Sequence, residues 1–116
     1  MTLLYVALGG AIGASLRYLT FLAVAFPTGT LVVNVLGSFL MGVTFVFLAQ
    51  RGLDRASVFT MTGVLGGFTT FSAFSLDAFR LYERGDVQQA GTYVLVSVIL
   101  SIFALVIGVF VARALA

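Results

Sequence analysis

Long apolar segments follow one another along this chain, with very few charged side chains inside them. We place four such segments at residues 3–24, 30–49, 56–79 and 89–112. Because about 20 apolar residues in a helix cross the roughly 30 Å of bilayer hydrocarbon, each segment is long enough to span a membrane. Only 9% of the residues are charged, which is too few to cover the surface of a soluble domain. The sequence therefore predicts an all-α integral membrane protein, with residues 1–116 forming a single four-span domain.

The third segment carries a run of residues that disrupts a helix: Gly66-Gly67-Phe68-Thr69-Thr70. Each glycine weakens a helix by about 1 kcal/mol relative to alanine. Irregular backbone at membrane depth is tolerated only where protein covers it or where it lines a water-filled cavity. We therefore expect the third span to be broken at this run, with the break covered by protein and a polar species bound there or passing by.

The loop arginines give only a weak bias in orientation. Arg51, Arg55 and Arg113 are predicted on the side of the termini, and Arg80 and Arg84 on the other side. Loop arginines normally decide the orientation of a membrane protein, with the excess facing the cytoplasm. Three against two is a small excess. It leaves open either a single topology or insertion in both orientations, which would allow two opposed copies to pair as an antiparallel dimer.

Small residues recur at the spacing that brings membrane helices close together. Gly9 and Gly13 form a G-x-x-x-G face, and Ser38 and Gly42 form a second pair at the same spacing. In lipid, such faces allow close backbone packing, which drives helix association there. The pattern is equally compatible with packing inside one protomer and with a subunit interface.

Arg17 lies about two-thirds of the way along the first segment. An arginine near the centre of a membrane helix costs roughly 2.5–3.5 kcal/mol on insertion scales. Such residues usually face a cavity or a partner and mark functional sites. Arg17 is thus a candidate for attracting an anion into a vestibule. The alternative is that its side chain extends to the nearby interface, which Tyr18 would mark.

Two polar faces have helical spacing. Thr30, Asn34 and Ser38 recur every four residues in the second segment, and Tyr93 and Ser97 are followed by a further serine, at position 101, in the fourth. Asn34 either bonds across helices or lines a pore. The fourth-segment hydroxyls either donate to a passing ion or bond back to the carbonyl four residues earlier.

Phe71 and Phe74 share a helical face directly after the predicted break. The ordinary interpretation is packing or lipid contact, but the positive edge of a phenylalanine ring can also touch an anion. No acid lies in the first, second or fourth segment, and Asp77 lies late in the third. The chain also lacks histidine and cysteine, so no cluster suits catalysis or a transition metal.

Three blocks of sequence occur in order: Gly9-Gly10-x-x-Gly13-x-x-x-Arg17-Tyr18, then Gly29-Thr30-Leu31-x-x-Asn34-x-x-Gly37-Ser38-Phe39-x-x-Gly42, then Gly66-Gly67-Phe68-Thr69-Thr70-Phe71-Ser72-Ala73-Phe74-Ser75. In these blocks the chain resembles the CrcB/Fluc family of fluoride channels over nearly its whole length. The resemblance implies a dual-topology homodimer in a bacterial-type inner (plasma) membrane, with two antiparallel pores built from both subunits. It implies passive export of cytoplasmic fluoride, with no nucleic acid as partner.

The resemblance also implies roles for individual residues. A structural sodium ion would be held by the backbone carbonyls of Gly66 and Thr69. The ion pathway would be formed by Phe71, Phe74, Asn34, Thr30, Arg17, Ser72, Tyr93 and Ser97. Family members often carry threonine where this chain has Ala73, which removes one hydroxyl from the implied path.

Two other classes of membrane protein remain as alternatives. A small dual-topology multidrug exporter shares the size and the span number, but it depends on a membrane carboxylate in its first helix, which this chain lacks. A non-transporting membrane subunit would explain the small-residue faces, but not the predicted break together with the polar faces.

Overall fold

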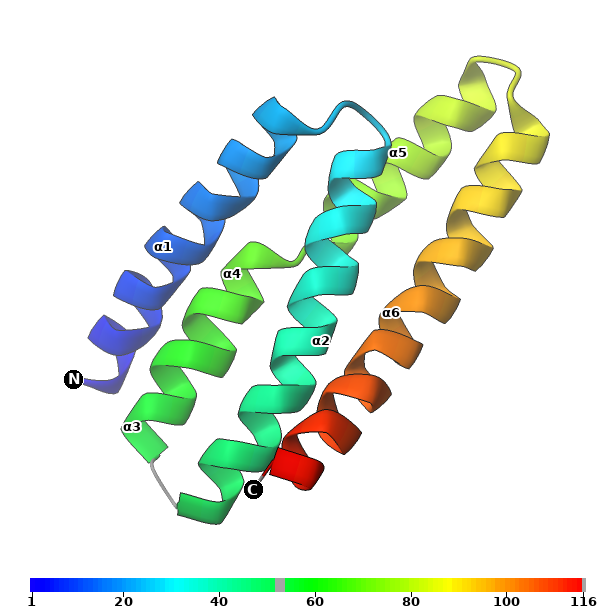
Figure 1. The fold of residues 1–116 in the computed structure, drawn as a ribbon. Helices are drawn as coiled ribbons and strands as arrows, with labels where there is room; N and C mark the ends of the chain where they lie inside the picture. The colour runs from blue at the N-terminus through cyan, green and yellow to red at the C-terminus, as the bar shows by residue number, and fades with distance from the viewer. Residues whose placement is uncertain (52–53, 116) are drawn as a thin grey trace.

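The computed structural model describes residues 1–51 and 54–115, and every regular element in that part of the chain is helical. Figure 1 shows the elements running up and down beside one another. In chain order they are α1 (Thr2–Ala23), α2 (Thr28–Arg51), α3 (Asp54–Ser57), the π-helix η1 (Val58–Leu65), α4 (Gly66–Phe68), α5 (Phe71–Glu83) and α6 (Val87–Leu115).

Three stretches are long and apolar enough to cross a membrane: α1, residues Thr28–Leu48 of α2, and α6. The chain is therefore a multi-pass membrane protein. The predicted segment 56–79 falls on four shorter elements, from α3 to α5. One of these is a π-helix, which the sequence analysis did not predict; such wide turns are rare and often lie at functional sites.

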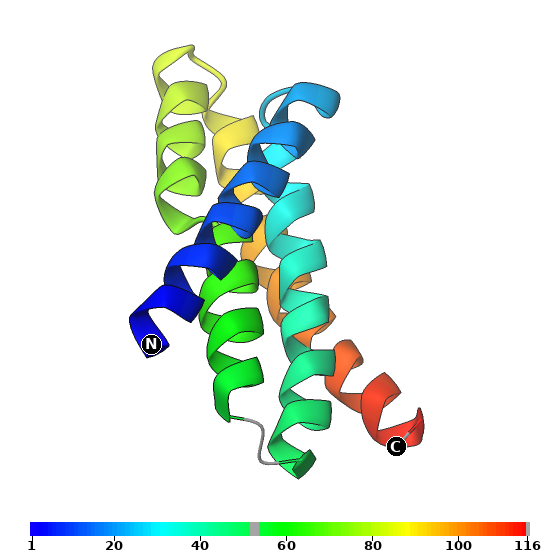
Figure 2. The same cartoon turned by 90° about the vertical axis from the view of Figure 1, so that its left-hand side faces the viewer.

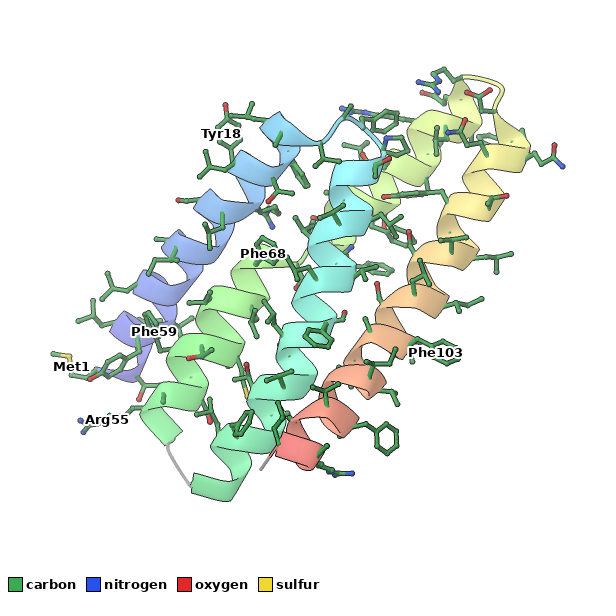
Figure 3. All side chains as sticks on the ribbon, viewed as in Figure 1. Met1, Tyr18, Arg55, Phe59, Phe68 and Phe103 are labelled. Carbon is green, nitrogen blue, oxygen red and sulfur yellow. The ribbon has the colours of Figure 1, made fainter. Side chains whose placement is uncertain are left out.

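The two ends of the bundle carry different parts of the chain. Figures 1 and 2 show both termini at one end, and the turns α1–α2 and α5–α6 at the other. Arg55 lies near Met1 in Figure 3. The predicted polar connection at residues 50–55 includes residues 52 and 53, which lie outside the described part of the chain, as does the side chain of Arg51.

The turn between α5 and α6 is a Schellman motif. Asp86 N–H donates to the Leu81 carbonyl, and Gly85 N–H donates to the Tyr82 carbonyl, both at 3.0 Å. Gly85 has a φ of 90°, a left-handed conformation that glycine adopts without steric cost. The motif ends α5 and reverses the chain into α6.

The G-x-x-x-G face of α1 packs inside the protomer. Gly9 and Gly13 are the buried residues of α1. A Cβ added to Gly9 would lie 2.9 Å from the Cα of Gly63 in η1, and one added to Gly13 would lie 2.8 Å from the backbone nitrogen of Phe68 in α4. The backbones therefore approach as closely as two glycines permit, which assigns this face to packing within one chain.

The second small-residue contact joins α2 to α6. A Cβ on Gly42 would lie 3.0 Å from the Val109 nitrogen, and one on Gly108 would lie 3.2 Å from the Val43 nitrogen. Each helix thus places a glycine against the backbone of the other. Large apolar side chains elsewhere, such as Phe103 in Figure 3, point outward, as expected for a surface that faces lipid.

Candidate functional site

Two residues of extended backbone separate α4 from α5. Thr69 has φ −83° and ψ 158°, and Thr70 has φ −153° and ψ 125°. Thr70 caps α5, since its Oγ1 accepts a hydrogen bond of 3.1 Å from the N–H of Ala73. This is an N-cap of the kind that threonine favours, so the sequence starts a new helix as soon as the previous one has ended.

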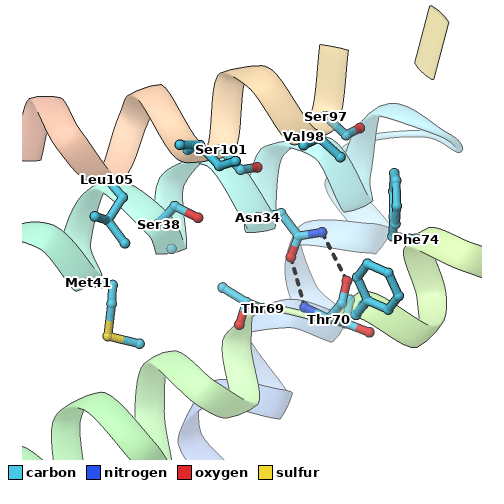
Figure 4. Close-up of a pocket in the computed structure, with 13 residues that line it drawn as sticks. Asn34, Ser38, Met41, Thr69, Thr70, Phe74, Ser97, Val98, Ser101 and Leu105 are labelled. Atoms are coloured by element: carbon cyan, nitrogen blue, oxygen red, sulfur yellow. Dashed lines mark hydrogen bonds between the residues drawn. The ribbon is translucent and has the colours of Figure 1, made fainter. Parts of the chain in front are cut away.

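Asn34 of α2 bonds twice to the backbone of Thr70 (Figure 4). Its Nδ2 donates to the Thr70 carbonyl at 2.9 Å, and its Oδ1 accepts from the Thr70 N–H at 2.8 Å. One side-chain amide thus satisfies both backbone groups of an extended residue. Between the two alternatives left by the sequence, the bond across helices is the one observed. Asn34 also lines the hollow described below.

The break leaves the carbonyl groups of Gly66 and Thr69 without their normal helical donors. In a continuous helix the Gly66 carbonyl would accept from Thr70 N–H, and the Thr69 carbonyl from Ala73 N–H. Thr70 N–H instead donates to Asn34, and Ala73 N–H donates to the Thr70 hydroxyl. The diverted donors leave the oxygens of Gly66 and Thr69 available to other partners.

Arg17 reaches one of these two carbonyls. Its Nη1 lies 3.5 Å from the Thr69 oxygen, in a partly buried position. The side chain therefore bends toward the break between α4 and α5. This contact places a positive charge beside the break.

A hollow of about 390 Å³ lies between α2, the break and α6 (Figure 4). It is lined by Asn34, Gly37, Ser38, Met41, Thr69, Thr70, Phe71, Phe74, Ser97, Val98, Ser101, Ile102 and Leu105. Residues more than 60 positions apart in the chain thus share one site. The structure brings together both predicted phenylalanines, the asparagine, Thr69 and Ser97.

The two phenylalanines touch but lie in different surroundings. Their ring centroids are 5.5 Å apart with the planes tilted by 50°. Phe74 is 7% exposed and packs against Tyr93, whereas Phe71 is 77% exposed. Phe74 is thus part of the core, and Phe71 stands at the open rim of the hollow.

Ser97 differs from three other helix hydroxyls, those of Ser15, Thr20 and Ser75. The hydroxyls of Ser15, Thr20 and Ser75 each donate to the carbonyl four residues earlier, at 2.6, 2.9 and 3.0 Å. Ser97 is 3% exposed, and its Oγ has no partner within the described residues. Buried hydroxyls are nearly always bonded, so this one offers its donor to the hollow.

Thr30 and Tyr93 meet at a residue that the sequence analysis did not include in the site. Asp77 is buried, and its Oδ2 accepts from Thr30 Oγ1 at 2.5 Å and from Tyr93 Oη at 3.3 Å. In the sequence, Asp77 lies late in the third apolar segment. Its spacing of three residues from Phe74 could have revealed it, because i and i+3 share a helical face.

Ser72 lies apart from the hollow. It is exposed, and its Oγ lies 3.2 Å from Thr70 Oγ1. The predicted path residues thus fall into four places: the hollow, the carboxyl cluster around Asp77, Arg17 beside the break, and Ser72 on the surface of α5.

Residues 4–109 match the protein family described as "CrcB-like protein, Camphor Resistance (CrcB)". The chain belongs to the CrcB-like family. Its relatives include proteins named "Fluoride-specific ion channel FluC" from three bacteria. That of Roseobacter denitrificans is 55% identical, covering 97% of this chain and 95% of its own. That of Cereibacter sphaeroides is 58% identical, covering 97% and 94%. That of Paracoccus denitrificans is 50% identical, covering 98% and 96%.

The match to the CrcB-like family spans both sides of the break and all three membrane-spanning helices. The relatives are similar to this chain over almost their entire length, so the whole protein and not one segment is related to them. The relatives named here are bacterial, which together with the apolar helices makes the chain a multi-pass protein of a bacterial inner membrane.

Proposed function

We propose that this chain is a fluoride-selective passive channel that exports cytoplasmic fluoride and so relieves fluoride toxicity. The observation that carries the proposal is the hollow beside the break, in a chain whose full-length relatives bear the name of a fluoride channel. A passive pore needs no catalytic group, so the protein is a channel and not an enzyme. The negative potential inside the cell drives an anion outward through such a pore.

The hollow offers the two kinds of contact that a small anion needs when it exchanges its water shell. Ser97 presents a buried hydroxyl without a partner. Phe71 and Phe74 present tilted rings whose edges carry partial positive charge. An ion passing between a hydroxyl and ring edges replaces its water molecules one at a time. Asn34 lines the same hollow, with Thr30 and Tyr93 on the nearby carboxyl cluster.

We further propose four spans and an antiparallel, dual-topology homodimer. In this arrangement η1, α4 and α5 together form the third span, interrupted at Thr69 and Thr70. The exposed ring of Phe71 at the rim of the hollow supports this, because a partner would cover the ring and complete the walls. Two opposed copies would then give two antiparallel pores, each built from both subunits.

A structural sodium ion fits the break. The carbonyls of Gly66 and Thr69 have lost their helical donors, and hard cations prefer oxygen ligands. Two carbonyls from each of two copies would supply four ligands. In the described part of the chain, no group of three His, Cys, Asp or Glu side chains gathers where it could hold a metal ion. The ion would supply positive charge that holds the two breaks together.

Arg17 and Ser72 complete the proposed path. The guanidinium of Arg17 attracts anions toward the break by its charge. Ser72 stands on the exposed side of α5, where the partner would approach. The exporter alternative is disfavoured because the first helix carries no carboxylate.

Growth of bacteria tests the proposal in cells. A strain without a fluoride channel of its own, when it expresses this chain, should grow at fluoride concentrations that arrest the same strain with an empty vector. A strain expressing Phe71→Ile at an equal level serves as the control for the path. Equal arrest of the strain with the unchanged chain and the strain with the empty vector would contradict the proposed function.

A further inference from the structure

Two features of the proposed channel meet at a single atom, the carbonyl oxygen of Thr69. It is one of the oxygens proposed to hold a metal cation, and it is also the atom that Arg17 Nη1 contacts at 3.5 Å. A guanidinium and a metal ion are both positive. They cannot occupy one oxygen together without repulsion, so their occupancies of this carbonyl are linked.

The N–H and the hydroxyl of Thr69 are both hydrogen-bonded within the chain, so the carbonyl is the polar group of this residue that can change its partner. Its N–H and its hydroxyl both donate to the Leu65 carbonyl, each at 3.0 Å. The donor that a continuous helix would supply, Ala73 N–H, bonds to the Thr70 hydroxyl instead. Across the described chain, Arg17 is the residue seen to donate to the Thr69 oxygen.

Among the side chains that the structure describes, no acid pairs with Arg17. The ion pair found in the described residues joins Arg84 to Asp86, at the far end of α5. The buried carboxyl of Asp77 takes its bonds from Thr30 and Tyr93. The partly buried guanidinium of Arg17 therefore contacts the Thr69 carbonyl. At 3.5 Å, this contact is at the long limit of a hydrogen bond.

We propose that Arg17 is a tethered cation that occupies the Thr69 carbonyl until a monovalent metal ion displaces it. The displaced guanidinium then turns toward the hollow, whose wall includes Thr69, and its charge becomes available to an approaching anion. Arg17 thereby acts as a positioning residue that couples cation binding to the positive potential of the anion path. This inference rests on the proposed sodium site.

The test is a titration of the purified protein in detergent with sodium chloride, with choline chloride keeping the ionic strength constant. The readout is the sodium concentration at the midpoint of binding, obtained by fitting the rise in melting temperature to its logarithmic dependence on the sodium concentration. Without its competitor the cation should bind more tightly, so Arg17→Gln and Arg17→Met should lower this midpoint fivefold or more. Arg80→Gln, which removes an arginine remote from the break, should leave it within twofold.

A merely structural role for Arg17 would lower the melting temperature at every sodium concentration and leave the midpoint in place. That result would overturn the proposal, as would an equal shift in Arg80→Gln or a melting temperature of the unchanged protein that does not respond to sodium. Fluoride efflux measured on the same preparations keeps the two proposals separate, since normal efflux without a sodium response contradicts only the competition.

A second measurement uses the unchanged protein and does not depend on how the variants fold. Sodium should move the side-chain ¹⁵N resonances of Arg17 and leave those of Arg80 in place. The Arg17 signal is assigned in the unchanged protein by its contact with Thr69. Arg17 resonances that stay fixed throughout the sodium titration would overturn the proposal.

Discussion

Asn34 and Thr70 exchange two hydrogen bonds across the break between α4 and α5, at 2.9 and 2.8 Å. The side-chain amide of Asn34, on α2, makes the two hydrogen bonds that a neighbouring strand would make to an extended residue. With Thr70 held in this way, its hydroxyl can cap α5 and aim the helix that carries Phe71 and Phe74. The geometry of the hollow therefore depends on the two hydrogen bonds between the Asn34 side chain and the Thr70 backbone, which belong to neither α4 nor α5.

Replacing Asn34 with alanine should destabilise the protein strongly. The substitution leaves the N–H and the carbonyl of Thr70 without partners at membrane depth, and each unsatisfied group costs about 1–3 kcal/mol. We expect the free energy of unfolding, measured by titration with a denaturing detergent, to fall by about 2–4 kcal/mol. Ser38→Ala, on the same face of α2, is the control. Equal losses in the two variants would contradict this role of Asn34.

Ser97→Ala should separate stability from transport. The serine hydroxyl is buried without a partner, so its removal should leave the free energy of unfolding unchanged or raise it by up to about 1 kcal/mol. Fluoride efflux from liposomes should nevertheless fall, because the hollow loses a buried hydroxyl donor. Ser75→Ala, whose hydroxyl bonds to the Phe71 carbonyl, should change neither. Unimpaired efflux in Ser97→Ala would remove Ser97 from the path.

Phe71→Ile should reduce fluoride efflux by about tenfold or more, because a lost ring-edge contact of about 1.4 kcal/mol raises the barrier by that factor. The ring is 77% exposed, so the fold should tolerate the change, and the dimer should still appear in size-exclusion chromatography. Phe79→Ile, at another exposed ring of α5, should keep normal efflux. If both variants behave alike, Phe71 is a packing or lipid-facing residue.

Gly13→Ala and Gly10→Ala form a matched pair on α1. A Cβ on Gly13 would lie 2.8 Å from the Phe68 nitrogen, whereas one on Gly10 meets nothing within 4 Å. We expect Gly13→Ala to cost about 1–3 kcal/mol of unfolding free energy through overpacking. Gly10→Ala should be neutral or stabilising by up to about 1 kcal/mol through helix propensity. Reversal of this order would contradict the packing of α1 against α4.

Periodicity in the sequence was enough to predict the apolar helices and the positions of the main polar faces. Gly66, Gly67 and the two threonines predict an interrupted third span, and Thr69 and Thr70 have extended backbone between α4 and α5. What periodicity gives is the face on which a residue lies. It does not give the partner, so it left two roles open for Asn34 until the Thr70 backbone was seen beside it.

The carboxyl cluster around Asp77 was missed for a related reason. The sequence shows only that Asp77 lies late in the third segment, whereas Thr30 and Tyr93, from two other helices, bond to its buried carboxyl group. The π-helix η1 was also not predicted; it lies against α1 where Gly9 and Gly63 approach each other. Both features lie at contacts between helices, which no single segment encodes.

The proposed channel is tested most directly by anion efflux from liposomes that contain the purified protein. With fluoride or chloride loaded inside at equal concentration and potassium permeability supplied by valinomycin, we predict rapid fluoride efflux and far slower chloride efflux. The fluoride rate should be the same with and without a proton gradient. Equal rates for the two anions, or fluoride efflux that requires the proton gradient, would contradict a fluoride-selective passive channel.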